Sequence, residues 1–398
     1  MKNHNGLSAG AVALITLGLA VVARGQDTPA RGNVVIPRSS LALPGDAGVR
    51  AHTNFLIFVP DRSRPAQSFS GETPASLACV YRLVTQVTGC PISGTTTNPS
   101  GGAGAIAIVD AYDDPNAARD LAAFSLTFGL AAANFSVVYA SGKKPPRDST
   151  GGWELEESLD IEWAHAMAPE AQLYLVEASS ASNSALFSAE TVAASLVAAA
   201  GGGEVSNSWG GGETRSETSN DSKYFDASDV VYFAAAGDSP GVIYPSSSPN
   251  VVSAGGTTVN RSGGNFTSES TWGSGGGGTS RYESRPSYQS SVSSIVGSRR
   301  GTPDFSFDAN PNTGVQVYDS NAYEGTVGPW WIVGGTSVSS PSLAGIVNRA
   351  GLFATSTNVE THNDIQQPWD FKRFPRYHLR ELRHALGQSR VRPVHWSW

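Results

Sequence analysis

The chain of 398 residues has little cysteine and little charge: it contains two cysteines, and charged residues make up 15% of it. Two cysteines are too few to build a metal site from thiolates. A low charged fraction together with 44 glycines argues against a coiled or disordered protein and favours a loop-rich globular domain with a sizeable core. The chain has no internal repeat.

Long apolar runs are also scarce. Lys2 precedes thirteen apolar or small residues, 11–23, which are too few for a comfortable membrane span. We interpret residues 1–25 as a signal peptide cut near Gly25, with a retained anchor as the lesser alternative. The protein is then secreted and extracellular, and Cys79 and Cys90 are expected to form one loop-closing disulfide.

Charge is distributed unevenly along the chain. The formal net charge is −7, yet residues 371–398 hold seven Lys or Arg and one acid. A basic tail can indicate nucleic acid or a membrane surface. Pro375, Gly387 and Pro393 interrupt this one, so we favour an appended solvated segment. We therefore expect no nucleic-acid partner, no stable membrane insertion and a monomer.

Residues 334–341, with the sequence GGTSVSSP, lead into an apolar stretch, 343–347, that is typical of a buried helix. Two glycines allow the backbone to approach a substrate closely, and a serine at a helix start lies near amides that favour negative charge. Ser337 is the candidate nucleophile. The alternative is that Thr336 or Ser337 only caps the helix.

A serine hydroxyl needs a proton acceptor, and a pair of acids offers one. Leu155, Leu159 and Trp163 recur at helical spacing, which predicts an amphipathic helix over 156–168. Glu156 and Asp160 are then four residues apart on one face, where they cannot both ionise easily and would share a proton. The alternative is a solvated acidic helix face. Among the histidines, His52 and His165 are the remaining candidates, and His165 is better explained as a packed helix residue.

Asp238 follows the strand-like run 230–236, at the kind of strand end where open parallel sheets build their sites. A protonated carboxylic acid there could donate a hydrogen bond to an oxyanion, which implies operation in acid. An ordinary turn residue after Gly237 is the competing interpretation.

Together these motifs resemble the sedolisin family, the serine-carboxyl peptidases with a subtilisin-like fold. The resemblance spans about residues 72–370 and includes the segments 206–210, 235–238, 253–257 and 334–341. It implies that Glu156 is the base toward Ser337, that Asp160 orients Glu156 and that Asp238 is the oxyanion donor. Neither His52 nor His165 has the Gly-Thr context of a subtilisin-type histidine.

The same resemblance suggests further groups. Asp110, at the end of the predicted strand 105–110, stands where sedolisins often have a glutamate in the catalytic network, although it also fits a turn. We place Trp209 in this supporting network. The family's calcium site corresponds to Asp364, Ile365 and Asp370, but its glycines are replaced and its loop is missing here, so calcium is a weak expectation.

The pattern of elements predicts an α/β fold, a subtilisin-like, doubly wound and mostly parallel sheet with helices on both faces. The strand-like runs are 105–110, 136–140, 172–177, 204–208, 230–235 and 251–254. The helical stretches are 116–129, 156–168, 185–199 and 339–350. Between 262 and 298 the sequence is rich in Gly and Ser, which predicts mobile loops beside the cleft.

We therefore divide the chain into a signal peptide (1–25), a linker or prodomain remnant (26–71), a peptidase domain (72–370) and a basic tail (371–398). About 46 residues before the domain are too few for the family's full prodomain. The expected function is an acid-acting secreted endopeptidase or tripeptidyl-type exopeptidase that acts on protein or peptide substrates. The alternatives are an inactive or unprocessed sedolisin-like protein and a conventional Asp-His-Ser hydrolase.

Overall fold

The structure is a computed structural model that describes residues 34–59, 71–92, 96–323 and 326–366. The chain divides into two units, residues 1–32 and 33–398, and everything described here belongs to the second. The signal peptide and the basic tail predicted from the sequence lie outside the described residues.

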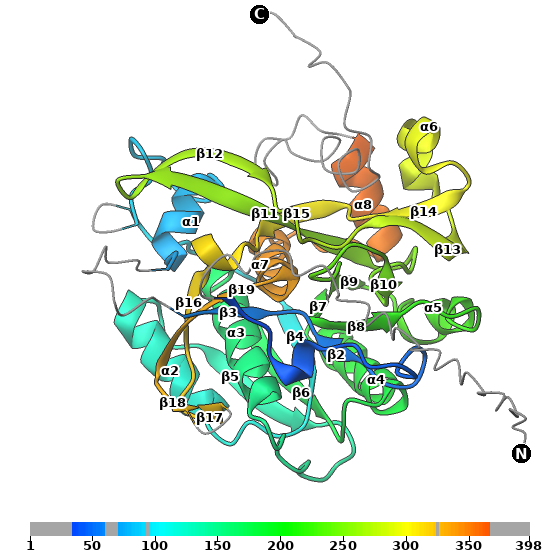
Figure 1. Ribbon diagram of the computed structural model, residues 1–398, viewed down its shortest axis with the longest axis horizontal. Coiled ribbons are helices and arrows are strands. Elements are labelled where there is room, and N and C mark those ends of the chain that lie inside the picture. Colours follow the sequence, from blue (N-terminus) through cyan, green and yellow to red (C-terminus); the bar gives the residue numbers. More distant parts are fainter. Residues whose placement is uncertain (1–33, 60–70, 93–95, 324–325, 367–398) are drawn as a thin grey trace, which may run out of the picture. The chain divides into compact units, whose positions relative to one another are not determined.

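A central sheet of eight strands organises the domain (Figure 1). Seven strands follow the order β12-β11-β9-β7-β4-β6-β5, and β15 pairs with β11. The pairs within it are parallel, except that β12 runs antiparallel to β11. The strands are β4 (Ala105–Ala111), β5 (Asn134–Tyr139), β6 (Gln172–Ala178), β7 (Gly203–Asn207), β9 (Val230–Ala235), β11 (Val252–Ser262), β12 (Asn265–Thr271) and β15 (Phe305–Asp308).

Helices cover both faces of this sheet, because alternate side chains of each strand point to opposite sides. Ile106 and Ile108 of β4 belong to the core shared with α2 (Ala117–Phe128), α3 (Gly152–Met167) and α7 (Thr336–Arg349). Val109 of the same strand belongs to the second core, with α4 (Asn183–Ala199). The expected doubly wound architecture is confirmed.

The described residues also form four smaller sheets. One has the order β1-β3-β19-β16 and another β10-β8-β2, while β13 pairs with β14 and β17 with β18. Their strands are β1 (Val34–Val35), β2 (His52–Thr53), β3 (Leu56–Phe58), β8 (Trp209–Gly212), β10 (Ile243–Tyr244), β13 (Gly278–Ser284), β14 (Arg299–Thr302), β16 (Val315–Tyr318), β17 (Ala322–Tyr323), β18 (Thr326–Val327) and β19 (Trp330–Gly334). Residues 34–59, which we assigned to a linker or prodomain remnant, thus supply three strands.

The remaining elements are short. They are α1 (Pro74–Val80), α5 (Thr218–Tyr224), α6 (Ser293–Val296), α8 (Thr357–Gln366) and the 3-10 turns η1 (Arg38–Ser40), η2 (Ser287–Val292) and η3 (Pro311–Thr313). Within the described ranges, no helix has the length and apolar character needed to cross a bilayer.

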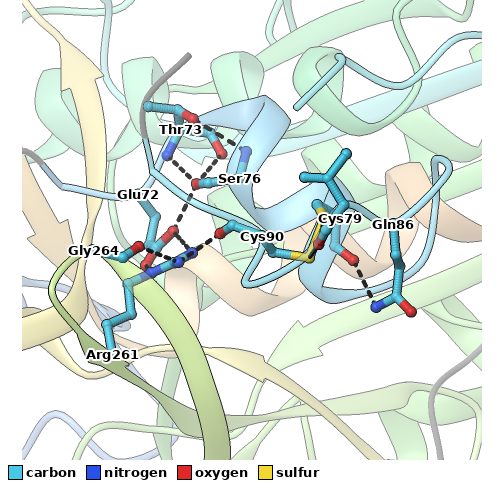
Figure 2. The surroundings of a disulfide bond; sticks show 9 residues. Glu72, Thr73, Ser76, Cys79, Gln86, Cys90, Arg261 and Gly264 are labelled. Carbon is cyan, nitrogen blue, oxygen red and sulfur yellow. Dashed lines mark hydrogen bonds and ion pairs between the residues drawn. A yellow bond between two sulfur atoms is a disulfide. The ribbon is translucent and has the colours of Figure 1, made fainter. Parts of the chain in front are cut away.

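Cys79 and Cys90 form the disulfide that the sequence predicts, and it closes the chain that follows α1 (Figure 2). Beside it, the Arg261 guanidinium pairs with the Glu72 carboxylate and donates to the Cys90 carbonyl oxygen at 2.7 Å. The Ser76 hydroxyl donates to the same carboxylate at 2.6 Å. Arg261 lies on β11, so these contacts attach α1 to the main sheet.

Two expectations need correction. The Gly/Ser-rich stretch 262–298 is not simply loop: it contains β12, β13, η2 and α6, because Thr, Tyr and Val between the glycines can pair and pack. The helix over 156–168 was expected to be amphipathic and only partly shielded. Instead α3 begins at Gly152 and is buried on every side.

Candidate active site

Ser337 is the second residue of α7, and its side chain is fully buried. Its hydroxyl donates to the Ser208 carbonyl oxygen at 3.2 Å and accepts from the backbone N–H of Asn54 at 3.2 Å. Gly335 precedes the helix with a φ of 109°, a conformation that favours glycine. A Cβ there would lie 2.3 Å from the Asn54 oxygen and 2.5 Å from Oδ2 of Asp238, so only glycine fits.

Close packing of two helices brings the acids to this serine. α3 and α7 lie against each other, and Gly345 of α7 allows the approach, because a Cβ on it would meet the Met167 Cβ at 2.7 Å. Glu156 and Asp160 on α3 are both fully buried. The solvated-face alternative is therefore wrong, because α3 has no solvated face.

The electrostatic environment of the two acids is unusual. Burial raises the pKa of Glu156 well above its ordinary value, and the carboxylates of Asp160 and Asp110 raise it further. The Ser337 hydroxyl opposes this shift. No hydrogen bond of ordinary geometry reaches the Glu156 oxygens from the described residues, so we treat Ser337 as a close neighbour. Burial likewise raises the pKa of Asp160, against the influence of Ser208 and Glu156.

Asp110, at the end of β4, extends this group of acids. It is fully buried, and its carboxyl oxygens have no hydrogen-bond partner among the described residues. Burial raises the pKa of Asp110 well above its ordinary value, with added contributions from the charges of Asp160, Glu177 and Glu190. Asp110 therefore belongs to the same electrostatic cluster as the two helix acids.

Asp238 lies three residues beyond the end of β9 and faces the start of α7. Its Oδ1 accepts from the Thr336 N–H at 2.7 Å and from the Thr336 hydroxyl at 2.9 Å. Its Oδ2 is buried and has no partner among the described residues. Burial raises the pKa of Asp238 to about 7, although both bonds from Thr336 oppose the shift. In acid this carboxyl is therefore a neutral group with a proton to donate.

The segment 206–210 forms one wall of the site. Besides accepting from Ser337, Ser208 donates its own hydroxyl to the Ser337 carbonyl oxygen at 3.3 Å. Trp209, the first residue of β8, donates its indole N–H to the Val109 carbonyl oxygen at 2.9 Å. Trp209 is thus a buried support next to Asp110.

Sequence reasoning missed Asn54. Its backbone N–H donates to the Ser337 hydroxyl, its carbonyl oxygen accepts from the Ser337 N–H at 3.0 Å, and its side-chain amide donates to the Ser208 oxygen at 3.1 Å. No motif marks this residue, and it lies 283 positions before Ser337. Asn54 is placed here only because β2 pairs with β8 and β3 pairs with β19.

The histidines make other contacts. The His165 ring is buried and bonds to the Ala131 carbonyl oxygen at 2.9 Å, and burial lowers its pKa. The His52 ring bonds to the neighbouring Thr53 carbonyl oxygen at 3.0 Å. Neither ring bonds to Ser337.

The structure does not test the predicted calcium site. Asp370 lies outside the described residues, and for Asp364 and Ile365 the structure describes only a helical backbone in α8. A calcium site at these residues stays a prediction.

We compared the chain with known proteins. No protein-family model matches it. It is 31% identical to kumamolisin from Bacillus sp. (strain MN-32), over 61% of this chain and 48% of that protein. It is 41% identical to sedolisin from Pseudomonas sp. (strain 101), over 28% of this chain and 20% of that protein. The chain thus spans less than half the length of these curated relatives.

A solved structure agrees with these matches. It is Pseudomonas sedolisin, described as a serine-carboxyl proteinase complexed with two molecules of pseudo-iodotyrostatin. The TM-score is 0.60 at 24% identity, and the match covers 75% of this chain and 86% of that chain. At this identity the likeness shows the fold alone.

The parallel sheet, covered by helices on both faces, with a helix-start serine close to two buried acids, defines a protein of subtilisin-like fold. The matches to sedolisin and kumamolisin make the assignment more specific. The chain resembles the sedolisin family in sequence and in fold.

Proposed function

We propose that this protein is a secreted serine-carboxyl peptidase that hydrolyses peptide bonds in acid, with Ser337 as nucleophile. The observation that supports this most is the position of Ser337 beside the buried pair Glu156 and Asp160, with a further acid of raised pKa, Asp238, at the same helix start. The sequence similarity to sedolisin and kumamolisin supports the same chemistry.

In the proposed mechanism the coupled pair supplies the base. One carboxyl of the pair ionises first, because two like charges in a buried site do not form together. The ionised Glu156 takes the Ser337 proton as the hydroxyl oxygen attacks a substrate carbonyl carbon, while Asp160 holds the shared proton. Glu156 then returns its proton to the leaving amine.

The oxyanion needs donors where its charge develops. The Ser337 backbone N–H is one, at the positive end of α7. Protonated Oδ2 of Asp238 is the second, since this oxygen is buried without a partner among the described residues. The raised pKa of Asp238, about 7, means that this donor is present in acid and is lost as the pH rises through neutrality.

A mutational test separates this mechanism from one based on histidine. Glu156→Gln and Asp160→Asn should each lower kcat on an acid-denatured protein substrate by about 10² to 10⁴, because each removes proton acceptance or its orienting partner. His165→Ala serves as the control and should keep most of the activity, once circular dichroism shows that it folds.

The opposite pattern would reject the proposal. If His165→Ala abolished turnover in a folded protein while both carboxamide variants kept it, the base would not be Glu156. Activity that peaks at neutral or alkaline pH would indicate a conventional Asp-His-Ser hydrolase. Product analysis on peptides with free and blocked N-termini then distinguishes endopeptidase from tripeptidyl-peptidase action, because a blocked N-terminus prevents only the latter.

A further inference from the structure

Two buried acids lie side by side next to the proposed catalytic pair. β4 and β6 are neighbouring parallel strands of the central sheet (Figure 1), and Asp110 of β4 is in register with Glu177 of β6. Ile108 and Leu175, two residues earlier on each strand, both belong to the core shared with α3 and α7. Because side chains alternate along a strand, Asp110 and Glu177 point to that same face, from backbones about 4.8 Å apart.

Both acids lack the hydrogen-bond donors that a buried carboxyl needs. Their side chains are fully buried. Neither oxygen of Asp110 has a partner among the described residues. Oε1 of Glu177 accepts from the Asp114 N–H at 3.4 Å, whereas Oε2 has no partner in the described part of the chain. Buried acceptors are almost always paired, so a proton on one of these acids is the donor that the other lacks.

The turn after β4 brings the Asp114 N–H to Glu177. Tyr112 in this turn has a φ of 81°, a left-handed conformation that is strained for a bulky residue and persists only where the surrounding structure requires it. Its backbone N–H donates to the Ala178 carbonyl oxygen at 2.9 Å, so the turn is bonded to the end of β6. The position of Glu177 is therefore fixed both by the strand pairing and by this turn.

Several charged or titratable groups face Glu177 from the neighbouring elements. They are Asp110, Asp113, Asp114, Glu157 and Lys144. Asp113 pairs with Lys144 at 3.1 Å, and the Asp114 carboxyl accepts from the Asn321 side-chain amide at 2.8 Å. Asp110 and Glu157 have no partner among the described residues, and of these two only Asp110 is in strand register with Glu177. Asp110 is therefore the neighbour to which a proton on Glu177 is best placed to bond.

Both acids are neutral in the acid range. Burial raises the pKa of Glu177 to about 8, the charge of Asp113 adds to the shift, and Lys144 opposes it. Burial raises the pKa of Asp110 well above its ordinary value, and the charge of Asp160 contributes next. Asp110 also faces Glu156 on α3 and Glu190 on α4. Each of the two neutral acids thus has one proton to donate beside the catalytic pair.

We propose that Glu177 is a positioning residue for the reaction, which donates its proton to Asp110 in a hydrogen bond. Asp110 then donates its own proton toward Asp160, and this chain of two neutral acids supports the negative charge of the catalytic pair. This inference rests on the proposed function. Each hydrogen bond in a chain polarises the next, so the donor on Glu177 strengthens the bond that Asp110 makes. The base that Ser337 needs therefore ionises at a lower pH than it would without Glu177.

Two variants of similar size separate the donor from the space that it fills. Glu177→Gln keeps a side-chain donor, whereas Glu177→Leu has none. The acid limb of kcat/KM against pH should keep its parental midpoint in Glu177→Gln. In Glu177→Leu the midpoint should move to higher pH by about half a unit or more, because the base is harder to ionise. Rates of the full chain on one peptide across the acid range measure both, once circular dichroism shows that the variants fold.

Infrared absorption tests the proton on Glu177 without relying on activity. At about pH 6 an ordinary glutamate, with a pKa of about 4.3, is ionised, whereas a neutral Glu177 still absorbs as a protonated carboxyl. Glu177→Gln should therefore lose the signal of one protonated carboxyl relative to the parent. Glu170→Gln removes an exposed carboxyl just before β6 and should leave that signal unchanged. If Glu177→Gln lost only carboxylate signal, the proposal would be overturned, even if Glu177→Leu did not fold.

The kinetic outcomes separate this inference from the proposed function. If the parent hydrolyses the peptide in acid and a folded Glu177→Leu keeps the parental midpoint, the inference is overturned and the proposed function stands. Equal shifts in the Gln and Leu variants would show that the donor has no part in the effect, which overturns the inference as well. If the parent cuts no peptide at any pH, the proposed function fails and this role of Glu177 fails with it, whereas the infrared comparison still shows whether Glu177 holds its proton.

Discussion

The two oxygens of the Asp238 carboxyl lie in different surroundings. Oδ1 accepts both hydrogen bonds from Thr336, whereas Oδ2 is buried and has no partner among the described residues. An ionised carboxylate would leave a charge on that second oxygen, and burial opposes this, which is why the pKa rises to about 7. The neutral acid and an amide share the ability to donate from this position.

This leads to a prediction for two substitutions. Asp238→Asn keeps a donor at every pH, whereas Asp238→Ala removes it and should lower kcat by about 10² to 10³. The loss of activity between pH 5 and 8 should also be less steep in Asp238→Asn than in the parent, because the amide does not titrate. Initial rates of the three proteins on one peptide measure both effects. Equal, near-parental rates in the two variants would show that Asp238 is only a turn residue.

Single residues were predictable where a local pattern marks them. Ser337 follows two glycines and a threonine, and Glu156 and Asp160 have helical spacing, so both features are visible within a few positions. Asn54 has no such mark, because its role depends on two strand pairings with residues far along the chain. Burial of the acids was also hidden, since periodicity does not show how many neighbours surround a helix.

At the scale of elements, the α3–α7 contact determines whether Ser337 and Glu156 meet. Gly345 lies at this contact, where a Cβ would be 2.7 Å from the Met167 Cβ and 2.9 Å from the Ala164 carbonyl oxygen. Gly345→Ala should cost about 1 to 3 kcal/mol of stability through overpacking and should lower kcat by separating the helices. Gly273→Ala, where a Cβ meets nothing within 4 Å, is the control. Chemical denaturation measures the stability of the two variants, and rates on one peptide measure their kcat. Equal stability and equal kcat in Gly345→Ala and Gly273→Ala would contradict this packing.

The disulfide between Cys79 and Cys90 restrains α1 and the loop after it. Cys79 and Cys90, eleven positions apart, close the loop that follows α1, and the Cys90 carbonyl oxygen accepts from Arg261 of β11 (Figure 2). Replacing both cysteines by serine should lower the free energy of unfolding by roughly 2 to 3 kcal/mol, mainly by freeing the unfolded chain. Thermal melts of the parent with and without reductant provide the measurement. An unchanged melting midpoint after confirmed reduction would show that the Arg261–Glu72 ion pair and the core hold this segment without the disulfide.

Apolar runs in the sequence predicted where helices and strands lie more reliably than where they begin and end. β9 was predicted at the observed bounds, and β4 and α4 within two residues, because each is bordered by glycine or a turn. α7 begins at Thr336 rather than Ser339, since its first turn is built from polar residues that periodicity ignores. The strands in 262–298 were missed because their glycines resemble those of loops, and only pairing reveals them.

At the scale of the whole molecule, many acids are buried. Carboxyls with raised pKa values occur on both faces of the main sheet, and burial is the largest cause in each. A carboxyl with a raised pKa in the folded state binds its proton more tightly there than in the unfolded chain. Its contribution to stability is complete below the unfolded pKa near 4 and is lost as pH rises toward the folded pKa. Stability should therefore be highest in acid.

Glu157 allows this to be tested away from the reaction. It is fully buried, both carboxyl oxygens have no partner among the described residues, and burial followed by the charge of Glu177 raises its pKa. Glu157→Gln removes one titrating proton, so its free energy of unfolding should fall less than the parent's between pH 4 and 7. Comparing two pH values within each protein cancels any fixed cost of burying the amide. Asp226→Asn removes an exposed carboxylate and should leave the parental slope unchanged. Denaturant titrations at both pH values give the slopes, and a parental slope in Glu157→Gln would mean that Glu157 is already ionised in the folded protein.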